Sequence, residues 1–429
     1  MFISSLYDKL KRILNRQSGA FMGFRKETDA FSYRRISANY VCTISGPIIT
    51  HGVITLDNSN TILDINQRDV DKSEDLEIYK GIIIPGFVNS HCHLELSHLR
   101  NKLRKKASGL IPFIEGISDI RKAKESDIVK AIEIEEQKIV DAGIVAVGDL
   151  SNTNFTFRQK CLENIRYHTF IEILGGNPDR ALEFFNRGMS LYEEAPTTGH
   201  GSKSIVPHAP YNSSPELLRL IREFSKKSRN VLTIHNQECK AEELFFKNRT
   251  GAFVGLYKRI DAKYDFFETN GRNSLPYTLL NLLDNNQLLL VHNTFTSPED
   301  IRYAVDYAKR VKGIIFWVLC PNSNLNIEGV LPDIPSFIKE DAEIAIGTDS
   351  LASNYQLSVL EEIKTINRYF PNIPIQSLLK WATLNGAKSL NFDSDLGSIE
   401  IGKKCGLNLL IGADLQKNDL QEAKVIRLT

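Results

Sequence analysis

The sequence predicts an α/β protein built on a (β/α)8 barrel, with a small β domain beside the barrel. Two observations predict the architecture. Eight short apolar runs alternate with long helical patterns in the middle of the chain, and β-like runs without intervening helices occur at both ends. A chain of 429 residues is long enough for one large domain with an appendage.

The two ends of the chain show the same β-like character. ISANYVCTI, GVITL and TILDI lie within residues 36–65, and turn-forming residues 57–60 separate the last two. A similar pattern returns in residues 405–415 and 423–429. We therefore expect residues 36–85 and 390–429 to build one composite β domain, and residues 86–389 to build the barrel.

The central runs have the length and composition of buried parallel strands. Helical patterns such as residues 128–143 and 298–311 lie between them. The alternative is an open doubly wound sheet, which would more often show a Gly-rich phosphate loop after its first strand, and none is present. The eight runs are IIIPGFVNSH (82–91), GIVAVGDLS (143–151), YHTFIEILG (167–175), KSIVPHAP (203–210), NVLTIHNQ (230–237), QLLLVHNT (287–294), GIIFWVLCP (313–321) and AEIAIGTDS (342–350).

Residues 1–35 form an N-terminal extension. Phe2, Leu6 and Leu10 stand at helical spacing among basic residues, and these charges interrupt the continuous apolar core that a secretory signal needs. Two interpretations stay open. The favoured one is an extension without readable function, or translation that in fact begins at Met22. The other is a helix lying weakly on a membrane surface.

The composition excludes several classes of protein. The chain has 53 basic and 52 acidic residues, so no global field attracts nucleic acid or an anionic membrane. No apolar run approaches the length that spans a bilayer, so no stable membrane insertion is expected. The six cysteines are scattered without a C-x-x-C pair, which fits a reducing compartment and a cytoplasmic protein.

Potential ligand and acid–base residues gather at the ends of the central runs. Active sites of barrels lie at the C-terminal ends of their strands, so these residues are expected to converge. The first run ends in His91 and His93, and side chains two apart on a strand point to the same face. The other residues in this position are His208, His235 with Glu238 three residues later, His292 and Asp349.

The H-x-H pair favours a metal site, because two imidazoles at a strand end are costly to bury without a partner. Given that pair, metal ligation is also favoured for His235 and Asp349. For His208 and His292, a role beside the metal or on the substrate is favoured over direct ligation.

Five further polar residues, four of them histidines, do not stand at the ends of the central runs. Glu95 and His98 lie past the first strand end, and loop hydrogen bonding and substrate contact stay open for both. His51, His168 and His200 are expected to be surface or satisfied core residues without a functional role.

The motifs PGFVNSHCH, VPHAPY, HNQE, LVHN, CPNSN and GTDSLASN together resemble the amidohydrolase superfamily, and within it the deaminase and chlorohydrolase branch. That branch includes methylthioadenosine/adenosylhomocysteine, guanine, cytosine and aminodeoxyfutalosine deaminases. The similarity covers residues 36–412. It implies a metal-binding (β/α)8 barrel with a β-sandwich built from both chain ends, and a homodimer as one oligomeric state.

The resemblance also implies the roles of the site residues. One divalent ion, zinc with iron as the alternative, is implied to be the cofactor, and the catalytic residues are implied to be Glu238, His292 and Asp349, with His208 contacting the substrate. Superfamily members with two metals commonly carry a carboxylated lysine at the end of the fourth strand. Here Lys203 stands at the beginning of that strand, which favours a single ion. The implied metal ligands are His91, His93, His235 and Asp349.

Two positions depart from the family pattern. Cys405-Gly406 replaces a common Ala-Asp in the end domain, and His292-Asn293 stands where many relatives have His-Cys or His-Gly. The first change is expected to lie away from the chemistry. The second is expected to alter the surroundings of His292.

The sequence thus predicts a hydrolase that deaminates an aminated heterocycle, nucleobase or nucleoside derivative through metal-activated water. Glu238 would protonate a ring nitrogen, while Asp349 accepts the proton of the water and His292 helps to stabilise charge. A chlorohydrolase or amine-releasing triazine hydrolase on the same site is the alternative. A non-catalytic scaffold is disfavoured because every expected ligand position is filled.

Residues 240–276 form a long segment with many aromatic residues between the fifth and sixth runs. One interpretation is a lid that stacks on a base and offers Arg249, Lys258 and Arg259 to an acidic group, which would favour a nucleoside with an extended 5′ group, as in aminodeoxyfutalosine deaminases. The other is ordinary helix packing against the barrel. The aromatic residues are Phe245, Phe246, Phe253, Tyr257, Tyr264, Phe266 and Phe267.

Overall fold

The structure is a computed structural model that describes residues 33–67, 75–103, 108–197, 199–228, 230–260, 262–269 and 271–429. The two interpretations of the N-terminal extension concern residues within 1–32, which lie outside these ranges. The predicted boundary at residue 35 is wrong, because residues 34 and 35 already belong to the strand Arg34–Val41. Within the ranges, no helix has the length and apolar composition that crossing a bilayer requires.

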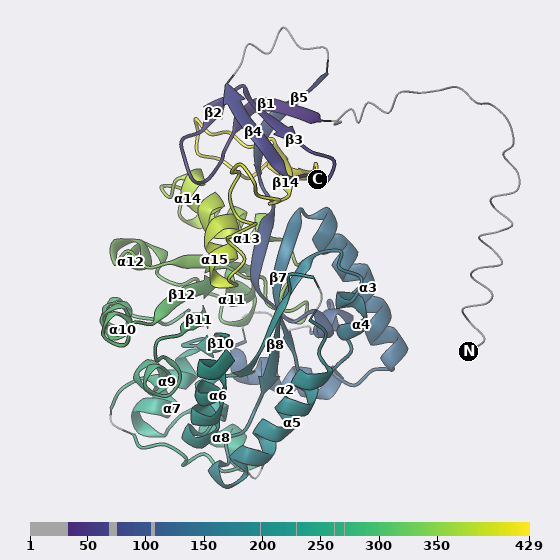
Figure 1. The fold of residues 1–429 in the computed structure, drawn as a ribbon. Helices are drawn as coiled ribbons and strands as arrows, with labels where there is room; N and C mark the ends of the chain where they lie inside the picture. Colours follow the sequence, from purple (N-terminus) through teal and green to yellow (C-terminus); the bar gives the residue numbers. More distant parts are fainter. Residues whose placement is uncertain are drawn as a thin grey trace, which may run out of the picture. The chain divides into compact units, whose positions relative to one another are not determined.

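Strands from both ends of the chain pair in one mixed sheet (Figure 1). Its order is β15-β14-β5-β1-β3-β4, with β2 paired to β1. The sheet therefore joins the two terminal segments that the sequence assigned to one β unit. Its strands are β1 (Arg34–Val41), β2 (Ile49–Thr50), β3 (Gly52–Leu56), β4 (Ile62–Gln67), β5 (Leu76–Pro85), β14 (Leu407–Ile411) and β15 (Lys424–Arg427).

The central region contains two four-stranded parallel sheets, in the orders β6-β7-β8-β9 and β10-β11-β12-β13. Each predicted run contributes one of these strands. The first run is divided at Gly86, because residues 82–85 end β5 of the mixed sheet and only the second half enters β6. The strands are β6 (Phe87–Cys92), β7 (Ile144–Ser151), β8 (Arg166–Ile173), β9 (Ser202–Pro207), β10 (Val231–Asn236), β11 (Gln287–His292), β12 (Ile314–Leu319) and β13 (Ile344–Ile346).

The two parallel sheets are linked at the C-terminal ends of their outer strands. After β9, the carbonyl of His208 accepts a hydrogen bond from His235 N at 3.0 Å. At the opposite edge, Cys92 and Asp349 form a parallel β-bridge, and His91 O accepts from Asp349 N at 3.1 Å. Both links lie where the sequence placed the candidate site residues.

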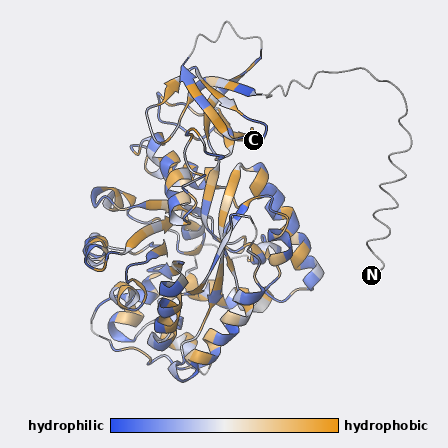
Figure 2. Ribbon diagram, in the orientation of Figure 1, coloured by the Kyte–Doolittle hydropathy of each residue, from blue (hydrophilic) through white to orange (hydrophobic). Residues whose placement is uncertain are grey.

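Helices between the strands bury one face each, and their two-sided hydropathy is visible in Figure 2. In α10, for example, Ile301, Ala304 and Ala308 are buried at helical spacing, and Ser297 with Asp300 forms a capping box at its start. The helices are α2 (Leu110–Ile120), α3 (Glu125–Asp141), α4 (Phe157–Lys160), α5 (Ala181–Glu194), α6 (Pro215–Ser228), α7 (Lys240–Asn248), α8 (Ala252–Arg259), α9 (Ser274–Leu282), α10 (Pro298–Val311), α11 (Pro321–Ile327), α12 (Ile334–Lys339), α13 (Val359–Tyr369), α14 (Ile375–Lys380) and α15 (Gly386–Ser389).

Candidate active site

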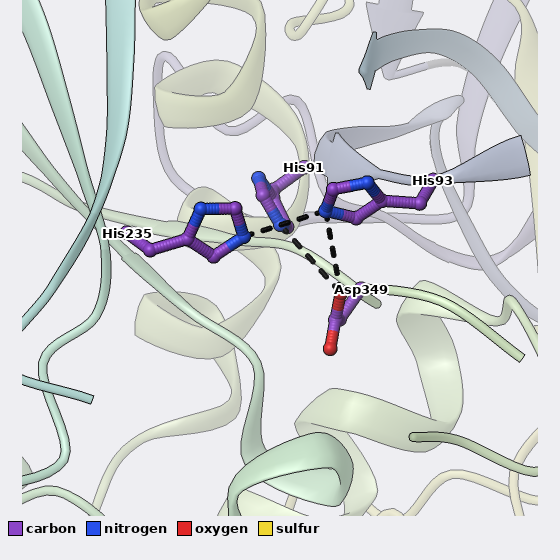
Figure 3. A group of neighbouring side chains, drawn as sticks. All are labelled: His91, His93, His235 and Asp349. Carbon is purple, nitrogen blue, oxygen red and sulfur yellow. Dashed lines mark hydrogen bonds and ion pairs between the residues drawn. The ribbon is translucent and has the colours of Figure 1, made fainter. Parts of the chain in front are cut away.

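Three imidazoles and one carboxylate converge at the C-terminal ends of the parallel strands (Figure 3). His91 and His93 come from β6 and the residue after it, His235 from β10, and Asp349 follows β13. Each offers one potential ligand atom, and these atoms lie within 4.8 Å of one another. Nε2 of His93 is 3.3 Å from Nε2 of His235, and Oδ1 of Asp349 is 3.6 Å from Nε2 of His93.

The electrostatics of this group suit a divalent cation. Burial lowers the pKa of His91 to about 3 and lowers the pKa of His93 and His235, so all three imidazoles are neutral near pH 7. Both ring nitrogens of His91 are buried without a hydrogen-bond partner. Buried polar atoms are rarely left without one. Neutral imidazoles with a carboxylate form a common donor set for zinc, so these residues fit a metal ion.

Asp349 is held as the charged member of the group. Burial alone would raise the pKa of its carboxyl, but His91, whose Nε2 lies 3.7 Å from Oδ1, and the nearby imidazoles of His292 and His93 outweigh burial and hold that pKa well below its usual range. The hydroxyls of Ser323 and Ser353 both donate to Oδ2. Oδ1 therefore remains directed at the imidazoles.

Hydrogen bonds to ring nitrogens set the orientation of His235 and His292. Nδ1 of His235 lies 2.7 Å from the carbonyl oxygen of His208. Because a carbonyl can only accept, Nδ1 carries the proton and Nε2 presents its lone pair to the group. Nδ1 of His292 likewise lies 3.0 Å from Oδ1 of Asn324, which leaves Nε2 of His292 facing Oε1 of Glu238 at 3.6 Å.

Glu238 and His208 line a pocket of about 260 Å³ beside the metal-type group. Burial raises the pKa of Glu238 to about 8, so this carboxyl is predominantly protonated at neutral pH. Asn212 Nδ2 donates to Nδ1 of His208 at 2.9 Å, and burial lowers the pKa of His208 to about 4. The neutral His208 thus offers an Nε2–H donor. The pocket contains protonated donors as well as an ionised carboxylate.

Residues 82–426 of the chain match the amidohydrolase family. The chain belongs to the amidohydrolase family. As a member of it, the protein is a hydrolase that acts on carbon–nitrogen bonds. An adenosine deaminase of Helicobacter pylori (strain ATCC 700392 / 26695) is 24% identical over 335 residues, which cover 77% of this chain and 78% of that protein.

Solved structures share the fold of this amidohydrolase. The aminofutalosine deaminase of Helicobacter pylori in complex with methylthio-coformycin superposes with a TM-score of 0.77 at 22% identity, covering 92% of this chain and 100% of that one. A zinc-bound adenosine deaminase from Xanthomonas campestris superposes with a TM-score of 0.71 at 19% identity, covering 91% and 90%.

The sequence did not identify the remaining walls of the amidohydrolase pocket. One wall is apolar and comes mainly from α2. The other carries Arg121, Asn152 and Glu172. Glu172 stands near the C-terminal end of β8, so the strand-end criterion that selected the histidines would also have found it. The apolar wall consists of Leu96, Leu110, Phe113, Ile114, Ile117, Leu174 and Tyr211.

Glu95 and His98 serve loop hydrogen bonding in the structure. Glu95 is buried and accepts from Asn152 N at 3.0 Å and from Arg121 Nη2 at 2.8 Å. His98 bonds the backbone oxygens of Glu95 and Arg121. Neither residue lines the pocket. Of the two interpretations left open, the loop interpretation therefore holds.

The three histidines that received no function lie outside the pocket. His51 and His200 are exposed. His168 is buried and bonds the hydroxyls of Ser202 and Ser204, each at 2.7 Å. Its hydrogen-bonding capacity is thus satisfied within the core.

The lid interpretation of residues 240–276 is wrong in one respect, because the aromatic side chains of the segment are not placed to stack on a base in the pocket. The aromatic side chains pack on one another, as Phe246 does on Phe267 with ring centroids 4.3 Å apart, and none of them lines the pocket. Arg249 donates to the carbonyl of Phe267, and Arg259 pairs with Glu115. The segment is a set of helices whose aromatic residues form a small apolar cluster together with Leu110, Tyr211 and Ile327.

Buried carboxyl groups accept hydrogen bonds from backbone amides in the loops of the active-site face. Asp149 accepts from Leu94 N at 2.8 Å, while Glu95 accepts from the backbone of the loop after β7. Glu242 and Glu362 hold the loops after β10 and β12 in the same way. Asp149 also pairs at 2.6 Å with Lys160, whose side chain is 2% exposed. The loops that carry the site residues are therefore fixed to neighbouring elements.

Proposed function

We propose that this amidohydrolase is a metal-dependent hydrolytic deaminase of an aminated heterocycle, most specifically a purine nucleoside or a derivative of one. One observation carries the proposal. A carboxyl with a pKa raised to about 8, Glu238, shares a pocket with a carboxylate whose pKa is held well below its usual range, Asp349. Two carboxyl groups with separated pKa values supply an acid and a base at the same pH.

The proposed architecture is the (β/α)8 barrel, closed by the two links between the parallel sheets, with a β-sandwich formed from residues 36–85 and 390–429. His91, His93, His235 and Asp349 would hold one divalent ion, and a zinc-bound structural neighbour supports zinc. When bound, such an ion supplies a water molecule that is acidic enough to react at neutral pH.

The side chains of the chain divide the remaining work. Asp349 accepts the proton of the attacking water, and Glu238 donates a proton to a ring nitrogen next to the carbon that bears the amine. The Nε2–H of His208 stabilises negative charge that develops on the substrate, and the Nε2 lone pair of His292 accepts a hydrogen bond from the attacking water. A carbon–oxygen bond forms, the carbon–nitrogen bond breaks, and the proton collected by Asp349 leaves with the amine as ammonia. The hydroxyl proton of the intermediate returns to Glu238 as the carbonyl of the product forms.

The proposal of a nucleoside rests on two supports. The relatives named above are deaminases of adenosine and aminofutalosine. The pocket of about 260 Å³ is at the small end of ligand pockets, and its apolar wall from α2 suits the face of a heterocycle. A chloride or alkylamine leaving group uses the same acid and base, so the leaving group itself has to be measured.

Ammonia release from the zinc-loaded protein tests the proposal. The panel is adenosine, methylthioadenosine, adenosylhomocysteine, aminodeoxyfutalosine, guanine, cytosine and an aminotriazine. We expect one or more of the adenosine compounds to release ammonia with turnover. Release of chloride or alkylamine from a triazine, with no ammonia from any nucleoside at full zinc occupancy, would overturn the deaminase assignment.

A further inference from the structure

Glu242 is a buried carboxyl beside the pocket whose two oxygens are both engaged. It is the third residue of α7 and is 1% exposed. Oε1 accepts from Gln237 N at 3.1 Å and from the hydroxyl of Ser274, and Oε2 accepts from Glu238 N at 3.2 Å. The carboxyl therefore holds the backbone on both sides of the peptide bond between Gln237 and Glu238.

This pattern differs from ordinary helix capping. The N-cap of α7 is Cys239, and an acidic residue in the third helical position usually bonds the amide of the N-cap itself. Glu242 instead reaches the amides one and two residues before Cys239. Its bonds fix the segment that leads from β10 to the pocket, and they are not needed to start the helix.

The segment that Glu242 holds has a sharp backbone turn. Gln237 has φ of 45°, a left-handed backbone conformation that residues other than glycine rarely adopt. Its side chain is also fixed, because Nε2 donates to Asp300 at 3.0 Å and Oε1 accepts from Thr296 at 2.7 Å. The turn sets the direction in which the next residue, Glu238, leaves the strand.

We propose that Glu242 is a positioning residue for Glu238: by bonding two successive amides, it keeps the Glu238 carboxyl aimed into the pocket opposite His292. The proposal rests on the proposed function, in which Glu238 is the acid. The groups around Glu238 that carry or can carry charge are His235, His292, Asp349, Glu242, Glu328, Tyr211, Cys239 and Cys320. Among them, Asp349, Glu242 and Glu328 oppose ionisation of Glu238 and add to the effect of burial on its pKa.

Glu242→Gln removes one acceptor while keeping the volume. Burial raises the pKa of Glu242 to about 7, so on the alkaline side of that value the substitution also removes a negative charge. In the zinc-loaded protein, we expect kcat to fall roughly 10- to 100-fold, because small displacements of catalytic groups have effects of that order. KM and zinc content should stay close to wild type. The alkaline limb of the kcat/KM profile should move to lower pH, because the charge of Glu242 no longer opposes ionisation of Glu238.

Glu136→Gln is the matched control. Glu136 is 1% exposed on α3 and accepts from Asn164 and Tyr167 at 2.8 and 2.7 Å, so it too is a buried carboxyl with several donors. Its substitution should change the melting temperature without moving the pH profile. An alkaline limb that stays at its wild-type pH in Glu242→Gln would overturn the proposal. So would an equal loss of kcat in Glu242→Gln and Glu136→Gln when both variants lose the same stability.

A substrate-free measurement separates this inference from the proposed function. The carboxyl band of Glu238, assigned by its loss in Glu238→Gln, can be titrated by infrared spectroscopy in the zinc-loaded protein. We expect its midpoint to fall in Glu242→Gln, and by a smaller amount in Ser274→Ala, which removes only one bond to Glu242 and serves if the first variant does not fold. Unchanged midpoints would contradict the inference. If the midpoints shift but no compound of the panel releases ammonia, only the deaminase assignment is contradicted.

Discussion

Oε1 of Glu238 lies 3.6 Å from Nε2 of His292, just beyond hydrogen-bonding range, with both side chains almost completely buried. The amide of Asn324 engages Nδ1 of His292, so Nε2 presents a lone pair to the carboxyl. A protonated Glu238 suits that neighbour, and its pKa of about 8 agrees with it. The pair therefore holds a proton beside the place where a substrate ring would lie.

Glu238→Gln should retain the metal and lose activity. The amide fills the same volume but cannot deliver a proton, and general acid catalysis contributes roughly 10²- to 10⁴-fold. Ammonia release and elemental analysis measure the two effects. Glu243→Gln on α7, the helix that follows Glu238, is the control, since Glu243 pairs with Lys240 and Lys247 at the surface, and it should keep both turnover and zinc. Near-normal turnover in Glu238→Gln would remove the acid role.

The pH dependence of kcat/KM follows from the protonation states. The active form needs a protonated Glu238, so the rate should fall as pH rises through about 8. On the acid side the active form needs neutral imidazoles, and the pKa values of His91 and His208, about 3 and 4, place that limb well below neutrality. A rate that instead increases with pH above 8 would contradict protonation by Glu238.

The same shift has a consequence for stability. An unfolded glutamate titrates near 4.5, and burial raises the pKa of Glu238 to about 8 in the folded protein. The folded state thus prefers the protonated form. The contribution of Glu238 to the free energy of unfolding is fully present below pH 4.5. It decreases by a few kcal/mol as pH rises to about 8. Glu238→Gln should therefore melt higher than the wild type at pH 9 and not at pH 5, measured on metal-free protein. An equal difference at both pH values would contradict the linkage.

His91→Asn should abolish metal retention. Both ring nitrogens of His91 lack a hydrogen-bond partner within the described protein, and the carboxylate that lies 3.7 Å from Nε2 belongs to Asp349, another proposed ligand. Elemental analysis after dialysis reports zinc occupancy. In the wild type, zinc at a hundredfold excess over Kd should add about 2.7 kcal/mol to the free energy of unfolding and so raise the melting temperature, and in the variant this effect should be absent. The exposed His51→Asn is the control. Full zinc occupancy in His91→Asn would exclude His91 as a ligand.

Lys160→Met should destabilise the protein strongly. It leaves the fully buried Asp149 without its cation, and breaking a buried pair from one side costs about 3–5 kcal/mol. Asp149→Asn combined with Lys160→Met should recover much of the loss in urea unfolding. Because Asp149 also bonds Leu94 N, zinc affinity should fall in the single variant as well. A single variant as stable as the wild type would mean that the pair has no net effect.

The sequence predicted which side chains would meet because parallel strands end at one edge and few polar residues occupy those ends. His235 and Asp349, 114 residues apart in the chain, are brought together on that basis alone. Arg121 escaped prediction because it follows a helix, and no periodicity tells which residue at a helix end faces a pocket. The aromatic segment misled for a related reason: aromatic side chains suit a binding surface and a small core equally, and only packing distinguishes them.

The carboxylates that hold the loops act across loop boundaries. Asp149 of β7 bonds the loop after β6, while Glu95 of that loop bonds the one after β7. An exchange of either loop alone with that of a relative would leave a buried carboxylate and several amides without partners. Variation of substrate range in this scaffold should therefore proceed by paired replacement, and libraries that recombine the first two loops as one unit should yield more folded proteins than libraries that shuffle them separately.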